Sequence, residues 1–256
     1  MHYTLSFKDK IVAVTGASKG IGRSIAVGFG SLRAHVILIS RTSELLEETA
    51  TMVREVGGTA SVISADLNQL DEIQKVVSEI KSTFKTLDVL VNNAGISKRK
   101  PSTEITEIEW DSILNTNLKS YFFMSSMVAE QIMIPQGYGK IVNTASIGGI
   151  VGITRSAPYS SSKGGVVMLT KVLGCEWAKH NIQVNAVAPA YIRTELIAKA
   201  IENKEFLETI ENRTPARRLG EPEEVVGGVL YLASHLASYV TGQVLAIDGG
   251  LTAYGV

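Results

Sequence analysis

The sequence has 256 residues, of which 45% are hydrophobic and 20% are charged. This composition is typical of a soluble globular protein, and the length fits one large domain more easily than two average ones. Lys and Arg together number 25, and so do Asp and Glu. Because nucleic acids and anionic membranes are bound by clustered cations in surplus, we expect neither as a partner.

The only cysteine, Cys175, rules out an internal disulfide framework. Four scattered histidines show no metal-ligand spacing, so we expect no metal site. The first ten residues lack the apolar core of a secretion signal. No apolar run approaches the length of about 18 residues that spans a bilayer. A cytoplasmic location is therefore the expectation.

Short apolar runs alternate with longer helical patterns along the chain. We predict buried strands at Ile11–Val14, Val36–Ile39, Ala60–Ser64, Val89–Val91, Ile141–Val142 and Val184–Val187, with an edge strand at Val244–Ile247. We predict helices at Ile21–Gly30, Glu44–Val56, Leu70–Phe84, Glu107–Met133 and Ser160–Lys179. Because the strands show little polar alternation, helices should cover both faces of a parallel sheet. The order predicts an α/β fold, one doubly wound, Rossmann-like domain over residues 1–256.

A charged helical stretch, Arg193–Arg218, interrupts this alternation after a late strand. An insertion there lies over the carboxyl ends of the strands, where ligands bind in such folds. We interpret it as a substrate lid over residues 193–218. A solvated surface helix is the alternative.

A glycine-rich turn follows the first strand and precedes a helix, with the spacing Gly-x3-Gly-x-Gly. Glycines allow the tight turn and a close backbone approach to a pyrophosphate, which the N–H groups of the helix N-terminus then bind. The Gly-Lys-Ser/Thr ending of a nucleotide hydrolase loop is missing. The predicted cofactor-binding residues here are Gly16, Ser18, Lys19, Gly20, Ile21 and Gly22.

Arg41 stands at the end of the second predicted strand, about twenty residues after the turn, where the adenine ribose is read in dinucleotide-binding folds. An acid there would bond the 2′-hydroxyl of NAD, whereas arginine suits a 2′-phosphate. Lys19 could add a second cation. We therefore predict NADP(H) as the preferred cofactor, with NAD(H) as the alternative.

Tyr159 and Lys163 are one helical turn apart, so their side chains share a face. Reduction of a carbonyl by hydride needs a proton donor for the developing alkoxide. A phenol has a pKa of about 10, and a neighbouring ammonium should lower it by favouring phenolate. Ser146, after the fifth strand, can hold the substrate oxygen by a hydrogen bond.

These motifs together resemble the short-chain dehydrogenase/reductase family. The matching segments are Thr15-Gly16-x3-Gly20-x-Gly22, Asp66-Leu67, Asn92-Asn93-Ala94-Gly95, Asn117, Ser146, Tyr159-x3-Lys163 and Ile247-Asp248-Gly249-Gly250. The likeness covers nearly the whole chain in order. It implies an oxidoreductase that acts on CH–OH groups, and it implies a homotetramer.

The resemblance also assigns roles to residues. It implies that Asn117 joins Ser146, Tyr159 and Lys163 as catalytic, by holding a water in a proton relay. It implies further cofactor contacts from Asp66, Leu67, Asn93, Ala94, Gly95, Tyr159, Lys163, Pro189, Ile192 and Thr194. The family usually has Pro-Gly where this chain has Pro189-Ala190, so the backbone is less free here, where the nicotinamide contacts are implied. Asp248-Gly249-Gly250 is implied to be structural, at a subunit contact.

The C-terminal third is similar to sugar-acid and polyol members of the family, such as gluconate 5-dehydrogenases. We therefore expect a hydride transfer between NADP(H) and a polar secondary alcohol or ketone. The basic residues Lys98, Arg99, Lys100 and Arg155 should rim the site and favour an anionic or polyhydroxy substrate, although a solvated cationic loop is the alternative. A 3-oxoacyl or other small ketone reductase remains open, and so does a non-enzymatic dinucleotide sensor or scaffold.

Overall fold

The computed structural model describes residues 4–254 and is built on one seven-stranded sheet in which every pair of neighbouring strands is parallel. The strands are β1 (Ile11–Thr15), β2 (His35–Ser40), β3 (Thr59–Ser64), β4 (Val89–Asn92), β5 (Gly139–Thr144), β6 (Ile182–Pro189) and β7 (Val244–Ile247). Their order across the sheet is β3-β2-β1-β4-β5-β6-β7. The prediction of a doubly wound parallel sheet is confirmed, and β7 is the predicted edge strand.

The strand order reverses between β1 and β4. Val12 pairs with Val36 of β2 on one side and with Val89 of β4 on the other, so the chain leaves β1 and β4 in opposite directions across the sheet. Ligands bind in α/β sheets at the carboxyl ends of the strands beside such a switch point. The segments after Thr15 and after Asn92 therefore face the expected crevice.

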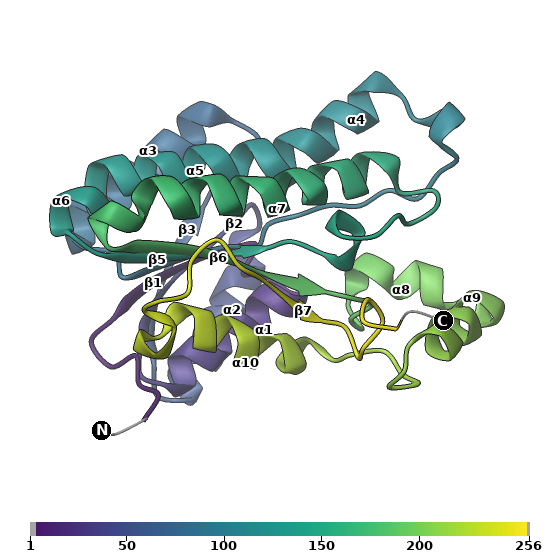
Figure 1. Cartoon of the computed structure of the whole chain (residues 1–256). Helices are drawn as coiled ribbons and strands as arrows, with labels where there is room; N and C mark the ends of the chain where they lie inside the picture. Colours follow the sequence, from purple (N-terminus) through teal and green to yellow (C-terminus); the bar gives the residue numbers. More distant parts are fainter. Residues whose placement is uncertain (1–3, 255–256) are drawn as a thin grey trace.

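Helices cover both faces of the sheet, as Figure 1 shows. The helices are α1 (Gly20–Ser31), α2 (Ser43–Glu55), α3 (Leu70–Phe84), α4 (Glu107–Leu114), α5 (Ser120–Val128), α6 (Ile134–Gln136), α7 (Ala157–Trp177), α8 (Glu195–Ile201), α9 (Lys204–Arg213) and α10 (Pro222–Ala233). Helices α1, α2 and α10 pack on one face, and α3, α5 and α7 on the other. Strand residues alternate between the two cores, since Val12 and Val14 belong to the first and Ala13 to the second.

The predicted helix Glu107–Met133 is interrupted twice. Two π-helical turns, Asn115–Lys119 and Ala129–Met133, separate α4, α5 and α6. Each π turn adds a residue to the helical repeat and rotates the next helix about its axis, and such turns are frequent at functional sites. The first of them carries Asn117.

Helix α10 was absent from the predicted elements. Two adjacent glycines, Gly227 and Gly228, obscure its apolar periodicity in the sequence. Close packing explains the second of them, because a Cβ on Gly228 would lie 2.7 Å from Cδ1 of Ile247. The helix begins at Pro222 behind a capping box formed by Glu221 and Glu224.

Helices α8 and α9 lie beyond the carboxyl end of β6 (Figure 1). The chain enters and leaves this segment at one place, because Ile192 and Gly220 form a bridge and Arg193 N–H donates to the Gly220 carbonyl at 2.9 Å. Across residues 4–254, no helix is both long and apolar enough to cross a membrane.

Candidate active site

The glycine turn after β1 is bent tightly against the segment that follows β4. Gly16 and Gly20 have φ values of +65° and +54°, which favour glycine. A Cβ on Gly16 would lie 2.8 Å from Cα of Ala94. A Cβ on Gly22 would overlap the Gly16 carbonyl oxygen, so Gly22 allows α1 to begin directly against the turn.

The N-terminus of α1 has the properties of an anion site. Its first turn holds no acidic residue, and Lys19 at the N-cap makes no side-chain capping bond. The first N–H groups of a helix have no partner within the helix, and they carry its positive dipole end. Together with the cradle that side chains at Gly16 and Gly22 would fill, this arrangement fits the pyrophosphate of a dinucleotide.

Arg41 lies beyond β2, at the edge of the same cradle. The Gly16 N–H donates to the Ile39 carbonyl at 2.7 Å, which ties the glycine turn to the end of β2. The side chains of Arg41 and Lys19 are exposed, and neither forms an ion pair with the part of the chain that the structure describes. Two cations without protein counter-ions suit a phosphate on the adenine ribose.

Asp66 and Leu67 follow β3, next to the end of β2. The Asp66 carboxylate accepts from the Asn68 N–H at 3.2 Å, which shapes the turn into α3. Leu67 is only 7% exposed and belongs to the core beneath α3. Asp66 is thus the better placed of the two to meet a ligand, and Leu67 mainly supports the turn.

The segment Asn93-Ala94-Gly95 joins the glycine turn to the centre of the site. The Thr15 hydroxyl accepts from the N–H groups of Asn93 and Ala94 at 2.8 and 3.1 Å. The Asn93 amide donates to the carbonyls of Thr15 and Gly16 at 3.1 and 3.3 Å. At the other end, the position of a Cβ on Gly95 lies 3.7 Å from Nζ of Lys163.

The structure brings Ser146, Tyr159 and Lys163 together at the carboxyl end of β5. Ser146 follows the strand, and its hydroxyl accepts from the Gly148 N–H at 3.1 Å. Tyr159 and Lys163 lie in the first two turns of α7, and Nζ of Lys163 is 5.9 Å from the centre of the Tyr159 ring. Lys163 is 3% exposed and donates to the Thr144 carbonyl at 2.6 Å.

Burial governs the ionisation of both groups. It lowers the pKa of Lys163 from 10.5 to about 7, because the ammonium is cut off from water. It also raises the pKa of Tyr159 above 10, although a hydrogen bond with Ser146 opposes this shift. The predicted lowering of the tyrosine pKa by the ammonium is therefore wrong for the protein without ligands. Desolvation of the phenolate is the larger cause, and it exceeds the lowering by the hydrogen bond with Ser146.

Asn117 lies in the first π-helical turn and is fully buried. Its side-chain amide bonds both polar backbone groups of Ile96: the amide oxygen accepts from the N–H and the amide nitrogen donates to the carbonyl, each at 2.9 Å. It also donates to the Ser162 hydroxyl at 3.1 Å. Asn117 thus joins the loop after β4 to α7, one residue before Lys163, without bonding Lys163 itself.

The residues after β6 approach the glycine turn from the other side. A Cβ on Gly20 would lie 3.3 Å from Cγ2 of Thr194 and 3.4 Å from Oε2 of Glu195. Pro189 ends the strand, and Ile192 is 5% exposed at the base of the α8–α9 segment. Ala190 N–H donates to the Ile247 carbonyl at 3.1 Å and its φ is not positive, so alanine replaces glycine there without backbone strain.

The basic loop is largely neutralised. Glu109 pairs with Nζ of Lys98 and of Lys100 at 2.6 and 2.9 Å, and these bonds hold the pKa of the glutamate at about 2. Arg99 points elsewhere, with its guanidinium 4.5 Å from the centre of the Phe206 ring in α9. The predicted cationic rim is therefore smaller than expected and consists of Arg99 and Arg155. The Arg155 carbonyl accepts from the Lys100 N–H at 3.0 Å, which joins the two loops.

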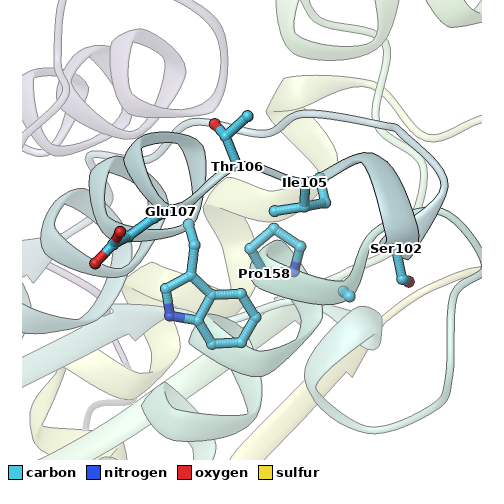
Figure 2. A pocket seen from close by; sticks show the side chains of 7 residues that line it. Ser102, Ile105, Thr106, Glu107 and Pro158 are labelled. Atoms are coloured by element: carbon cyan, nitrogen blue, oxygen red, sulfur yellow. The ribbon is translucent and has the colours of Figure 1, made fainter.

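A cavity of about 360 Å³ lies between the segment that follows the basic loop and the start of α7. It is lined by Ser102, Ile105, Thr106, Glu107, Trp110, Ala157 and Pro158. Figure 2 shows the side chains of Ile105 and Pro158 facing each other, while the Glu107 carboxylate points away. None of the four predicted catalytic residues lines this cavity, so it borders the site without being its centre.

Sequence reasoning missed two residues of this region. Glu109 stands three residues after Thr106, the spacing of a capping box, and both reciprocal bonds of that box are present in α4. That pattern could have located it. Tyr121, whose hydroxyl is 3.4 Å from Nζ of Lys163, follows Asn117 by four residues within an apolar helix, and no sequence signal distinguishes it from a core residue.

Comparison with known proteins gives consistent results. Residues 16–252 match a family model described as Enoyl-(Acyl carrier protein) reductase. The chain is 39% identical to gluconate 5-dehydrogenase of Gluconobacter oxydans, over 93% of each chain, and 36% identical to 5-keto-D-gluconate 5-reductase of Escherichia coli, over 98% of each. A crystal structure from Beutenbergia cavernae, described as an NAD(P)-dependent gluconate 5-dehydrogenase with NADP bound at low occupancy, is 40% identical over 98% of this chain and 99% of that one, with a TM-score of 0.94.

Proposed function

The chain belongs to the short-chain dehydrogenase/reductase family, and we propose that it transfers hydride between NADP(H) and the secondary alcohol or ketone of a sugar acid or polyol. The likeness to gluconate dehydrogenases and ketogluconate reductases over nearly the full length supports the substrate class. A dinucleotide sensor without catalysis would not need Ser146, Tyr159 and Lys163 together, and all three lie in one cluster.

One observation carries this proposal. The segment Asn93-Ala94-Gly95 contacts the glycine turn at one end and runs beside Lys163 at the other, where a Cβ on Gly95 would lie 3.7 Å from Nζ. The anion site at α1 and the phenol–ammonium pair of α7 therefore share one wall at the carboxyl edge of the sheet. A dinucleotide with its phosphates on α1 would extend along that wall toward Tyr159.

The chemistry then follows from the chain's own groups. Bound NADP(H) supplies the hydride acceptor or donor. The Ser146 hydroxyl holds the substrate oxygen, and the Tyr159 hydroxyl gives its proton to that oxygen during reduction or receives one during oxidation. The Lys163 ammonium, when charged, favours the tyrosine phenolate. Asn117 fixes the Ile96 backbone and α7 around them.

We propose that residues 193–218 form the substrate lid. The pairing of Ile192 with Gly220 closes the segment into a loop at its base. The loop after β4 contacts the lid through Arg99, whose guanidinium stacks on the Phe206 ring. The Phe206 ring also packs edge-on against Tyr191, with 6.1 Å between the ring centres. Such a loop can move about its base without disturbing the sheet.

We propose NADP(H) over NAD(H) because Arg41 and Lys19 offer two cations beside the ribose position that no carboxylate among residues 4–254 pairs with. We also propose a cytoplasmic homotetramer. A free exposed thiol, Cys175, suits a reducing compartment. Two separate apolar faces support two kinds of subunit contact: Phe122, Met168 and Val172 on α5 and α7, and Tyr239, Leu245 and Tyr254 near the C-terminus.

The test measures the oxidation of NADPH and of NADH, by nicotinamide absorbance, with three substrates. These are 5-keto-D-gluconate, a long apolar ketone and a 3-oxoacyl thioester. We expect the highest kcat/KM with the keto acid and NADPH. Faster turnover of the thioester would instead favour a 3-oxoacyl reductase, and the absence of turnover with every ketone of a wider panel would remove the enzymatic proposal.

A further inference from the structure

Tyr121 is a buried phenol that the proposed chemistry does not use. It lies in α5, is 1% exposed, and packs with Ala145, Val166 and Ala186 beneath the site. A phenylalanine would fill the same space without removing a hydroxyl from water. Burial of a hydroxyl is unfavourable unless it finds partners, so the partners of this one are informative.

Both partners of the Tyr121 hydroxyl belong to the catalytic cluster. It donates to the Thr144 carbonyl at 3.4 Å and accepts from Nζ of Lys163 at 3.4 Å. Lys163 also donates to that same carbonyl at 2.6 Å. A hydroxyl has one donor and two acceptor positions, so in this triangle the Tyr121 hydroxyl donates to the carbonyl and accepts from the ammonium at once.

The ammonium lies between two phenol rings. Nζ of Lys163 is 5.1 Å from the ring centre of Tyr121 and 5.9 Å from that of Tyr159. The groups that face it are Tyr121 from α5, Tyr159 from α7, the Thr144 carbonyl from β5 and the segment around Gly95. Within residues 4–254, no carboxylate pairs with Lys163. Among these residues, neutral oxygens and aromatic rings are thus the groups that replace the water lost by the buried ammonium.

We propose that Tyr121 is a positioning residue, whose hydroxyl holds the Lys163 ammonium in its charged form beside Tyr159. The inference rests on the proposed function for its catalytic meaning. Burial keeps the pKa of the Tyr121 hydroxyl well above 10, so this phenol remains neutral and can accept from the ammonium throughout the working pH range. Ser146 bonds Tyr159 and not Tyr121, so the two phenols have different tasks.

The decisive variant is Tyr121→Phe, which keeps the ring and removes only the hydroxyl. Titration of Lys163 is followed in the full-length protein by NMR of carbon-13-labelled lysine, with the resonance assigned by its loss in Lys163→Met. The unaltered protein should titrate near pH 7. Loss of an acceptor disfavours the ammonium, so in Tyr121→Phe the midpoint should fall by about half to one pH unit.

Tyr138→Phe is the matched control, since Tyr138 precedes β5 at the opposite end of the sheet, and it should leave the midpoint unchanged. Tyr121→Met, whose flexible side chain fills the same space, is the second variant and should show the same downward shift. An unchanged midpoint in a folded Tyr121 variant would overturn the proposal.

A second readout uses alcohol oxidation. At pH 7 the rate should fall about two- to fivefold in Tyr121→Phe, because the charged fraction of Lys163 falls by that factor and the phenolate of Tyr159 loses support. Above pH 9, where Lys163 is neutral in both proteins, the loss should be small, and KM for the alcohol should stay the same at each pH. An equal loss of rate at every pH would indicate mere misfolding of the site and would count against the proposal. The NMR titration needs no substrate, so its result stands apart from the outcome of the substrate panel.

Discussion

Replacing Lys163 with methionine should stabilise the protein at acidic pH and should have much less effect at alkaline pH. The side chain is 3% exposed, and burial lowers its pKa from 10.5 to about 7. Between these two values the unfolded chain binds a proton that the folded protein does not. The cost of burying the amine is therefore complete below about pH 7 and disappears as the pH approaches 10.5, so this group makes stability rise with pH.

The magnitude follows from that shift. Each pH unit well inside the window changes the free energy of unfolding by about 1.4 kcal/mol, so the total change between pH 6 and pH 9 is about 3 kcal/mol. Methionine fills the space but leaves the Thr144 carbonyl without its 2.6 Å bond, at a cost of about 1 to 3 kcal/mol. That cost does not depend on pH, so it cancels when the two pH values are compared.

The assay is urea unfolding of the ligand-free protein and of Lys163→Met at pH 6, 7.5 and 9, at one protein concentration, because assembly would make stability concentration-dependent. Lys81→Met, on the exposed side of α3, is the control and should follow the unaltered protein. If the curves of stability against pH for Lys163→Met and the unaltered protein run parallel, the assigned burial cost is wrong.

Four further substitutions test other parts of the site. Tyr159→Phe should lower turnover about 10²- to 10⁴-fold while the Kd for NADPH, measured by fluorescence, changes less than about twofold, and retained turnover would refute the proton role. Arg41→Asp should shift the ratio of NADPH to NADH affinities toward NADH about ten- to hundredfold, and an unchanged ratio would place the 2′-phosphate elsewhere. Arg99→Met should speed tryptic cleavage within residues 193–218 about threefold, since loss of the stacking on Phe206 weakens lid closure, and equal cleavage rates would exclude that contact as a latch. Glu195→Gln should tighten cofactor binding about threefold in titration calorimetry, because a carboxylate near Gly20 repels phosphates, and weaker binding would contradict this placement.

The sequence predicted the sheet well because its strands are buried on both faces. Runs such as Val36–Ile39 have almost no polar residues, and that pattern, followed by helical periodicity, admits few arrangements. The helix at Leu70–Phe84 was predicted with the bounds that the structure shows. Helix α10 was missed because Gly227 and Gly228 break its periodicity, and only the approach of Ile247 explains the second glycine.

The sequence predicted which residues lie together at the candidate site, but it predicted few of the interactions between them. Turn chemistry and helical spacing identified Gly16, Tyr159 and Lys163 because these signals are local. The direction of the tyrosine pKa was wrong because it depends on burial, which is a property of the whole fold. The pairing of Lys98 and Lys100 with Glu109 was missed because the loop folds back onto α4.

The paired base of the α8–α9 segment has a consequence for how specificity can change. Because Ile192 pairs with Gly220 at the base of this segment, we expect that the residues in between can be lengthened, shortened or exchanged while Tyr159 and Lys163 on α7 remain in place. The proposed substrate lid is thereby separated along the chain from the residues proposed to carry out the proton transfer. A graft of residues 196–218 from a relative that acts on a different alcohol should transfer that relative's substrate choice, while Thr194 and Glu195 keep their place beside the glycine turn.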